Sequence, residues 1–169
     1  MANFLHVCFN HLPIGRNSER SSSMITVNFD GGCEPKNPGG VSTWGYAVYR
    51  DGKHIHEAYG LATKPFDPGA TNNMGEYTAA LRAVEYLAAN GHTGEEIEIR
   101  GDSQLVVNQV GGSWKVKAAN LRPLHAAIRK LLPRFASIRF KWVPREENSE
   151  ADEIAGRAYI DYKAGRPVR

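Results

Sequence analysis

The sequence contains few cysteines and no long hydrophobic run, and these shortages exclude several classes of protein. Its 169 residues include only two cysteines, Cys8 and Cys33, which do not make a disulfide framework and favour a reducing compartment, the cytoplasm. No apolar run approaches the roughly 18 residues of a membrane-spanning helix, so we expect no membrane association. The N-terminus has no basic region before its short apolar start and no clear cleavage site, which is not typical of a secretory signal.

Acidic residues are missing from one long segment of the chain. The formal net charge is only +3, but the segment from Ser103 to Arg145 holds nine basic residues and no Asp or Glu. The rest of the chain is therefore net acidic. A basic segment of this kind suggests a polyanionic partner. A solvated helix face, on which Lys and Arg stems cover apolar surface, explains the charge equally well.

The length and composition predict one domain with short tails. Apolar residues make up 41% of the chain, which is enough for a hydrophobic core. The polar stretch before Met24 is rich in helix and strand breakers and predicts a disordered tail over 1–23. We expect the folded domain over 24–164 and a C-terminal tail over 165–169.

Two hydrophobic periodicities predict five strands and four helices in the order βββαβααβα. Alternation with a period of two predicts the strands, whereas apolar residues three or four positions apart predict the helices. Three meandering strands followed by alternating helices and strands indicate an α/β fold, with helices on the faces of a mixed five-stranded sheet. The expected strands are 25–29, 42–50, 54–62, 96–100 and 137–143, and the expected helices are 74–90, 103–110, 118–132 and one from 149 onward.

Four carboxylates stand at the ends of these predicted elements. Asp30 follows the first strand and Asp102 follows the fourth, so both emerge at the same carboxyl edge if the two strands are parallel neighbours. Glu76 lies in the first turns of its helix, and Asp152 lies near the start of the last helix. Carboxylates gathered in one cleft repel one another, and Mg²⁺ relieves this repulsion through its preference for oxygen ligands. Two such ions can activate a water molecule and stabilise the leaving oxygen in phosphodiester cleavage.

Each of these acids also has a purely structural interpretation. Asp102 could be an N-cap, and Ser149 with Asp152 resembles a capping box. Glu76 could favour the positive end of its helix, and Asp30 could form an Asx turn. Taken singly, capping is the favoured interpretation of Asp102 and Asp152. Four acids at compatible ends, with no Lys or Arg adjacent in sequence, favour a metal-binding cluster.

Four motifs, in this order, make the sequence resemble the type 1 ribonuclease H family (ribonuclease HI). They are FDGGCEPKNPGG, TNNMGEYTAAL, GDSQLVVNQV and VPREENSEADEIA, and they extend from Met24 to about Ala158. The resemblance implies the ribonuclease H fold, with sheet order 3-2-1-4-5 and an antiparallel second strand. It also implies an endonuclease that uses Mg²⁺ or Mn²⁺ to cleave the RNA strand of RNA–DNA hybrids, leaving 5′-phosphate and 3′-hydroxyl ends. We expect a monomer without an obligate protein partner.

The resemblance assigns roles to individual residues. Asp30 would bridge two metal ions, Glu76 and Asp102 would complete one metal site, and Asp152 would complete the other. Asn and Gln side chains would read the minor groove of the hybrid, because they carry the donors and acceptors that a 2′-hydroxyl requires. Backbone groups around the first glycines would approach the RNA, and a threonine would help to hold a DNA phosphate. The expected substrate-binding residues are Gly31, Gly32, Cys33, Asn37, Thr71, Asn72, Asn73, Gln104, Lys115 and Lys117.

Two departures from the family pattern place the sequence beside its handle-less archaeal and bacterial branch. The run from Val110 to Ala119 is too short for the basic handle that some members carry. Trp114, Lys115 and Lys117 could form a reduced substitute for contact with the DNA strand, or could serve ordinary packing and solvation. The loop before Asp152 has no histidine, whereas many members have a mobile one there.

The sequence alone leaves two other functions open. Exonucleases and junction resolvases of the same superfold use similar acids, but in them Asn37, Asn72 and Asn73 would have no reason to favour a 2′-hydroxyl. A non-catalytic module that binds hybrids would retain the acids only as helix caps. Cleavage of a substrate panel separates these hypotheses.

Overall fold

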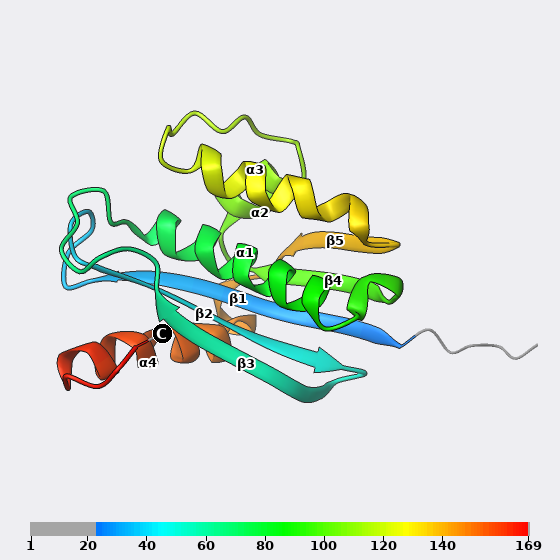
Figure 1. Ribbon diagram of the computed structural model, residues 1–169, viewed down its shortest axis with the longest axis horizontal. Coiled ribbons are helices and arrows are strands. Elements are labelled where there is room, and N and C mark those ends of the chain that lie inside the picture. Colours follow the sequence, from blue (N-terminus) through cyan, green and yellow to red (C-terminus); the bar gives the residue numbers. More distant parts are fainter. Residues whose placement is uncertain (1–22, 169) are drawn as a thin grey trace, which may run out of the picture.

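The computed structural model describes residues 23–168, so all but the last residue of the expected N-terminal tail lies outside the described part. Five strands form one mixed sheet in the order β3-β2-β1-β4-β5, which confirms the predicted fold (Figure 1). The elements also follow the predicted order. No helix in the described residues is both long and apolar enough to cross a membrane.

Two kinds of pairing build the sheet. β1 (Met24–Glu34) pairs antiparallel with β2 (Val41–Arg50), and β2 pairs antiparallel with β3 (Lys53–Leu61). β1 also pairs parallel with β4 (Glu96–Gly101), which in turn pairs parallel with β5 (Ser137–Trp142). The antiparallel second strand therefore confirms the expected topology.

The first strand differs from its predicted length in a way that matters for the site. The expected strand ended at Phe29, but β1 continues through Asp30 to Glu34 by pairing with β2. Its parallel pairing with β4 nevertheless stops at Asn28 opposite Arg100. Asp30 therefore pairs with β2 on one side of β1. On the other side it lies just beyond the parallel pairing with β4, at the carboxyl edge of the sheet.

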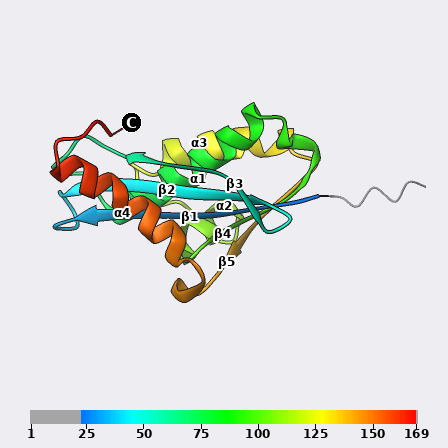
Figure 2. The same cartoon turned by 90° about the horizontal axis from the view of Figure 1, so that it is seen from below.

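Four α-helices cover the two faces of the sheet. They are α1 (Asn72–Ala89), α2 (Gln104–Val110), α3 (Arg122–Leu131) and α4 (Ser149–Lys163). The third helix begins four residues later than the predicted 118, with Pro123 in its first turn, where a missing N–H costs no hydrogen bond. Short 3₁₀ turns occupy His92–Gly94, Leu132–Arg134 and Arg145–Glu147. Figure 2 shows α1 and α3 on one side of the sheet and α4 on the other.

The main core lies between the sheet and α1. Ile25, Val27 and Phe29 of β1 are fully buried on this face because alternate strand residues point to opposite faces. The predicted helix stripe that includes Tyr77 and Val84 is also buried. The intervening β1 residues, including Asp30, point to the opposite face, where α4 packs. This alternation places the first acid outside the apolar core.

Candidate active site

The structure brings the four predicted acids together at the carboxyl edge of β1 and β4. Asp30 is only 7% exposed. Its burial, followed by the negative charge of Asp102 and then those of Glu76 and Asp152, raises the pKa of Asp30 to about 8. A backbone hydrogen bond from Gly31 acts in the opposite direction. Because all three other acids act on Asp30, the residues form one electrostatic cluster.

A neighbouring hydroxyl holds the second acid in place. The Ser103 hydroxyl donates a hydrogen bond to Oε2 of Glu76 at 2.5 Å. Burial raises the pKa of Glu76 and the charge of Asp102 adds to that rise, whereas the bond from Ser103 lowers it. Similarly, the amide N–H of Gly31 donates to Oδ1 of Asp30 at 2.7 Å. Both acids are therefore oriented by groups beside them in the fold.

Asp102 is held through its side chain and through its main chain. The side-chain amide nitrogen of Asn148 donates to Oδ1 of Asp102 at 3.1 Å. The Trp142 indole nitrogen donates to the main-chain carbonyl of Asp102 at 3.1 Å. Neither Asn148 nor Trp142 was identified as a site residue from the sequence. The only available signal was an Asn just before a predicted helix, which indicates an ordinary cap.

Asp152 is the most exposed of the four acids. Its side chain is 55% exposed, and its Oδ1 lies 3.6 Å from a guanidinium nitrogen of Arg145. An ion pair as exposed as this one contributes little to stability. Arg145 thus occupies the loop in which many family members carry a histidine, and it faces the last acid directly.

The capping interpretations of Asp102 and Asp152 do not hold in the structure. Ser103, not Asp102, is the N-cap of α2, and its hydroxyl oxygen accepts a hydrogen bond from the Val106 amide at 3.3 Å. Asn148 precedes α4 without any side-chain capping bond, so the Ser149–Asp152 box is not formed. These two acids are consequently free of the structural roles that best explained them singly.

Two glycine contacts bring helices close to Asp30. A Cβ at Gly31 would overlap the main chain of Gly75 and Glu76, so the absence of both side chains lets α1 approach β1 beside the second acid. The expected approach of the Gly31 main chain to the RNA stays a prediction, whereas the structure shows that Gly31 also makes room for α1. On the other face, a Cβ at Gly45 would overlap the main chain of Ala155, three residues beyond Asp152.

The donor set fits divalent metal ions in its chemistry. Carboxylate oxygens are the ligands that Mg²⁺ prefers, and the raised pKa of Asp30 reflects first its burial and then the repulsion from its acidic neighbours, which a cation would relieve. Within residues 23–168, however, no three His, Cys, Asp or Glu side chains are arranged as a ready-made metal site. Instead, the Glu76 carboxylate accepts a hydrogen bond from Ser103, and the Asp102 carboxylate accepts one from Asn148.

Comparison with known proteins identifies the family. Residues 28–158 match the family described as reverse transcriptase-like. Ribonuclease HI of Halobacterium salinarum is 36% identical over 137 residues, which cover 81% of this chain and 65% of that protein. Ribonuclease H of Aromatoleum aromaticum is 31% identical over 148 residues, which cover 80% of this chain and 90% of that protein. The chain belongs to the type 1 ribonuclease H family.

A solved structure supports the same assignment. LC11-RNase H1 in complex with RNA/DNA hybrid superposes with a TM-score of 0.69 and 32% identity, covering 79% of this chain and 95% of that chain. The curated relatives also include longer proteins. The chain spans 65% of the length of the Halobacterium ribonuclease HI and 35% of three mycobacterial relatives that are 33% identical to it.

Three of the four expected minor-groove residues of this ribonuclease H domain, all asparagines, lie at or beside the start of α1. The side-chain oxygen of Asn37, in the loop after β1, accepts a hydrogen bond from the Asn72 amide at 3.3 Å. Thr71 is the N-cap of α1, and its hydroxyl oxygen accepts from the Met74 amide at 3.1 Å. The helix cap thus brings Thr71, Asn72 and Asn73 beside the loop that carries Asn37. Their contacts with a substrate stay a prediction.

The other substrate candidates differ in accessibility. Cys33 is only 5% exposed, and its thiol faces the Lys36 and Ala70 carbonyls at 3.2 and 3.5 Å. Only its main chain can therefore contact a ligand. Gln104 is exposed at the first turn of α2. Gly32 is half-buried in β1, so its expected contact also falls to the main chain.

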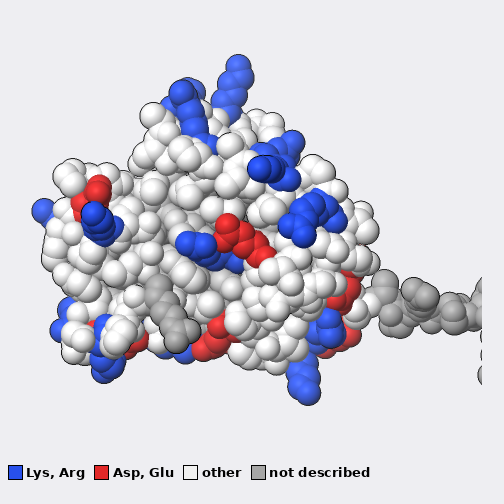
Figure 3. Space-filling view, viewed as in Figure 1, with Lys and Arg blue, Asp and Glu red and all other residues white. Residues whose placement is uncertain are grey.

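The basic segment divides into two parts in the structure. Arg139 and Lys141 on β5 form ion pairs with the Glu98 carboxylate of β4, so their charges are already balanced by this acid. The cations of the α2–α3 loop and of α3, by contrast, form no ion pair with any described carboxylate. Figure 3 shows Lys and Arg atoms over the part of the surface where α3 and this loop lie. These cations are available to a polyanion.

The loop between α2 and α3 has no helix, as the sequence predicts for a ribonuclease H without the handle. It spans residues 111–121, and both Lys115 and Lys117 are exposed in it. Trp114 is 49% exposed. The Gln109 side chain donates to the Lys115 carbonyl at 3.1 Å, which anchors the middle of the loop to α2. The Ser113 and Trp114 amides also donate to the Asn108 carbonyl, and Leu121 at the end of the loop is buried, so the loop is attached at both ends while its lysines stay exposed.

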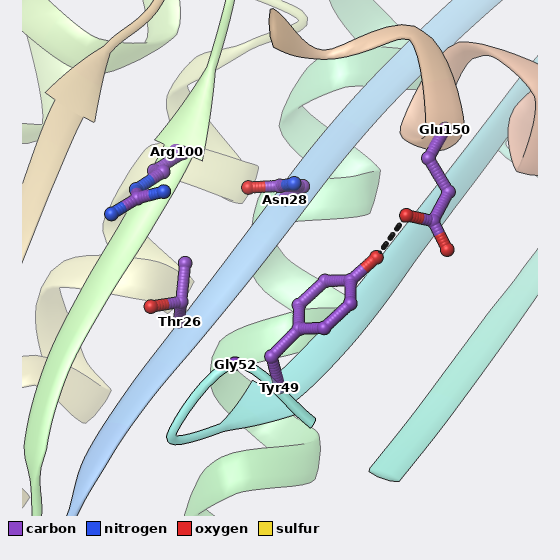
Figure 4. A pocket seen from close by; sticks show the side chains of 6 residues that line it. All are labelled: Thr26, Asn28, Tyr49, Gly52, Arg100 and Glu150. Atoms are coloured by element: carbon purple, nitrogen blue, oxygen red, sulfur yellow. Dashed lines mark hydrogen bonds between the residues drawn. The ribbon is translucent and has the colours of Figure 1, made fainter. Parts of the chain in front are cut away.

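A separate pocket lies on the α4 face of the sheet (Figure 4). It has a volume of about 240 Å³ and contains none of the four carboxylates. Figure 4 shows Arg100 and Asn28 beside it, and the Tyr49 hydroxyl donating to Glu150. Arg100 is already paired with Glu98 at 2.6 Å. Oδ1 of Asn28 is buried without a hydrogen-bond partner among the described residues.

Proposed function

We propose that this chain is an endoribonuclease that hydrolyses the RNA strand of RNA–DNA hybrids and leaves 5′-phosphate and 3′-hydroxyl ends. The observation that carries the proposal is the convergence of four carboxylates around Asp30, whose pKa is raised to about 8 by burial and by its acidic neighbours. Strongly perturbed acids in a cluster are typical of functional sites. The ribonuclease H relatives, and the LC11 structure that holds an RNA/DNA hybrid, support the choice of substrate.

The acid cluster would hold two divalent cations, Mg²⁺ or Mn²⁺. Asp30 would contact both ions, Glu76 and Asp102 would complete one site, and Asp152 would complete the other. When bound, two such ions activate the attacking water and stabilise the leaving oxygen. The hydrogen bonds from Gly31 and Ser103 fix the starting positions of Asp30 and Glu76.

The protein would recognise the RNA strand through amide side chains. An Asn or Gln side chain offers both a donor and an acceptor, and the 2′-hydroxyl needs both, which distinguishes RNA from DNA. Asn37 and Asn72 are joined by a hydrogen bond, so the β1–β2 loop and the start of α1 present one surface. Asn73 and Gln104 would extend this surface along α1 and α2.

The DNA strand would lie against the basic loop and the start of α1. Lys115 and Lys117 are exposed and form no ion pair among the described residues, so they can neutralise phosphates without breaking an existing contact. Thr71 would offer its hydroxyl to a DNA phosphate at the N-terminus of α1, where the helix dipole favours an anion. Phosphate contacts of this kind fix the register of the duplex on the protein.

A substrate panel tests the proposed function. Labelled RNA–DNA hybrid, duplex RNA, duplex DNA and a four-way junction are each incubated with Mg²⁺ or Mn²⁺, and the products are sized and their ends identified. We expect cleavage of the RNA strand of the hybrid alone. Asp102→Asn should abolish it, because one metal-binding carboxylate is removed.

The matched control is Glu153→Gln, which removes an exposed carboxylate beside Asp152 in sequence. This variant should cleave the hybrid at the wild-type rate. An intact hybrid, or equal cleavage by Asp102→Asn, would refute the proposal. Preferential cleavage of the junction would instead favour a resolvase.

A further inference from the structure

A buried asparagine at the start of α4 contacts the chain beside three of the four acids. Asn148 is 1% exposed. Its side-chain nitrogen donates to the Phe29 carbonyl at 3.0 Å and to Oδ1 of Asp102 at 3.1 Å, so both amide hydrogens are used. Phe29 immediately precedes Asp30. One side chain therefore joins the main chain of β1 to the carboxylate at the end of β4.

The main chain of the same residue begins the helix that carries the last acid. The Asn148 amide donates to the Arg145 carbonyl at 3.0 Å, and its carbonyl accepts from the Asp152 amide at 3.2 Å. One residue thus contacts the segments that carry Asp30, Asp102 and Asp152. Neither of its side-chain hydrogen bonds is to its own helix.

An ordinary capping role does not account for Asn148. A capping Asn turns its side-chain oxygen toward the first amides of the helix, but Asn148 forms no such bond. Its Oδ1 is buried and has no hydrogen-bond partner among the described residues. An unpaired buried acceptor costs about 1–3 kcal/mol. The unpaired oxygen therefore costs folding free energy, while the nitrogen of the same side chain donates to Phe29 and Asp102.

We propose that Asn148 is a positioning residue that fixes the Asp102 carboxylate for cation binding. Its bond to Oδ1 leaves Oδ2 of Asp102 without a partner among the described residues, so this second oxygen is available to a ligand. Both partners of the Asn148 nitrogen are acceptors, so only a donor suits the position. An Asp of the same size would place an oxygen against the Phe29 carbonyl and a second negative charge against Asp102.

The first experiment measures Mg²⁺ binding to the full chain without substrate, by calorimetry, in wild type, Asn148→Ala and Asn148→Asp. Loss of a residue that orients a metal ligand typically weakens binding or activity by about 10- to 100-fold, and we expect weaker Mg²⁺ binding in this range. Ile128→Val is the control, because Ile128 is fully buried in α3 and its truncation lowers stability without touching the acids. It should bind Mg²⁺ as wild type does.

A second measurement works even if both variants fail to fold. In the wild-type protein, NMR should show side-chain amide hydrogens of Asn148 that exchange with solvent far more slowly than those of the exposed Asn72. Equal exchange rates would overturn the proposal. Folded variants that bind Mg²⁺ like wild type would also overturn it, because Asn148 would then serve stability alone.

The effect on turnover rests on the proposed ribonuclease activity, whereas the effect on Mg²⁺ binding does not. At saturating Mg²⁺, Asn148→Ala should lower kcat for the hybrid by about 10-fold or more, with KM changed by less than about twofold, because the acids and not the substrate surface are displaced. A rise in KM with unchanged kcat would overturn the positioning role. If wild type cleaves no hybrid but Asn148→Ala still weakens Mg²⁺ binding, the proposed function fails and the positioning role stands.

Discussion

Replacing Asp30 by Asn should stabilise the metal-free protein at neutral pH while abolishing activity. The Asp30 carboxyl is buried beside three other acids, so its charged form is strongly disfavoured in the folded state. Asn has nearly the same shape, its oxygen can still accept the bond from the Gly31 amide, and it carries no charge at any pH. The substitution therefore removes the cost of charging or protonating a buried acid and retains the packing.

The structure sets the size and the sign of this effect. The pKa of Asp30 rises from the ordinary 3.8 to about 8, and a difference of one pH unit corresponds to ~1.4 kcal/mol. Because the folded state binds this proton more tightly, the protonated acid contributes stability that is fully present below pH 3.8 and is lost as the pH rises through about 8. At pH 7 the upper limit of the gain from Asp30→Asn is about 4 kcal/mol, and relaxation of the cluster leaves about 1–4 kcal/mol.

Urea unfolding in EDTA, at several pH values, measures the effect. The free energy of unfolding of Asp30→Asn should exceed that of wild type at pH 7, and the two should converge near pH 3.5. Asp152→Asn is the control, since Asp152 is largely exposed and its replacement should change stability by less than about 0.5 kcal/mol. Added Mg²⁺ should stabilise wild type more than Asp30→Asn. If Asp30→Asn is less stable than wild type at pH 7, the claim that the buried Asp30 carboxyl destabilises the metal-free protein is refuted.

Two further predictions concern α4 and the basic loop. Gly45→Ala should destabilise the protein by about 1–3 kcal/mol in thermal unfolding, because the new Cβ overlaps the main chain of Ala155, whereas Gly156→Ala, with open space around the new Cβ, should stabilise α4 by up to about 1 kcal/mol. Replacing Lys115 and Lys117 by Ala should weaken hybrid binding and reduce the slope of log K against log salt by about 0.7–0.9 for each phosphate that the loop no longer neutralises. An unchanged slope would show that the loop does not contact the duplex.

Hydrophobic periodicity was sufficient to predict the order of the elements. The stripe on α1 that includes Tyr77 and Val84 is buried, and the alternating residues of β1 form the centre of the core. The boundaries were less well predicted where a tertiary contact overrides the local pattern. β1 continues beyond Phe29 because β2 supplies partners as far as Glu34, and no property of the Gly-Gly pair at 31 and 32 predicts that pairing.

The four acids could be identified from the sequence because each lies at or near the end of a predicted regular element. That placement is a local property, and the parallel pairing of β1 with β4 turns it into proximity. The close approach of α1 through Gly31 and Gly75 could not be predicted, because it depends on two main chains that meet only in the fold. The role of Asn148 was missed for the same reason, since Phe29 is 119 positions away in the chain.

The sequence by itself determined the α/β class, the strand and helix order, the set of candidate acids and the excess of positive charge between Ser103 and Arg145. These features depend on periodicity, element ends and composition, which are all local. Only the tertiary structure decided which cations pair with Glu98 of β4 and how closely the helices approach Asp30. It also decided which buried side-chain amide donates to the Asp102 carboxylate. These depend on distances between segments far apart in the chain, and such distances are fixed only when the sheet and helices pack together.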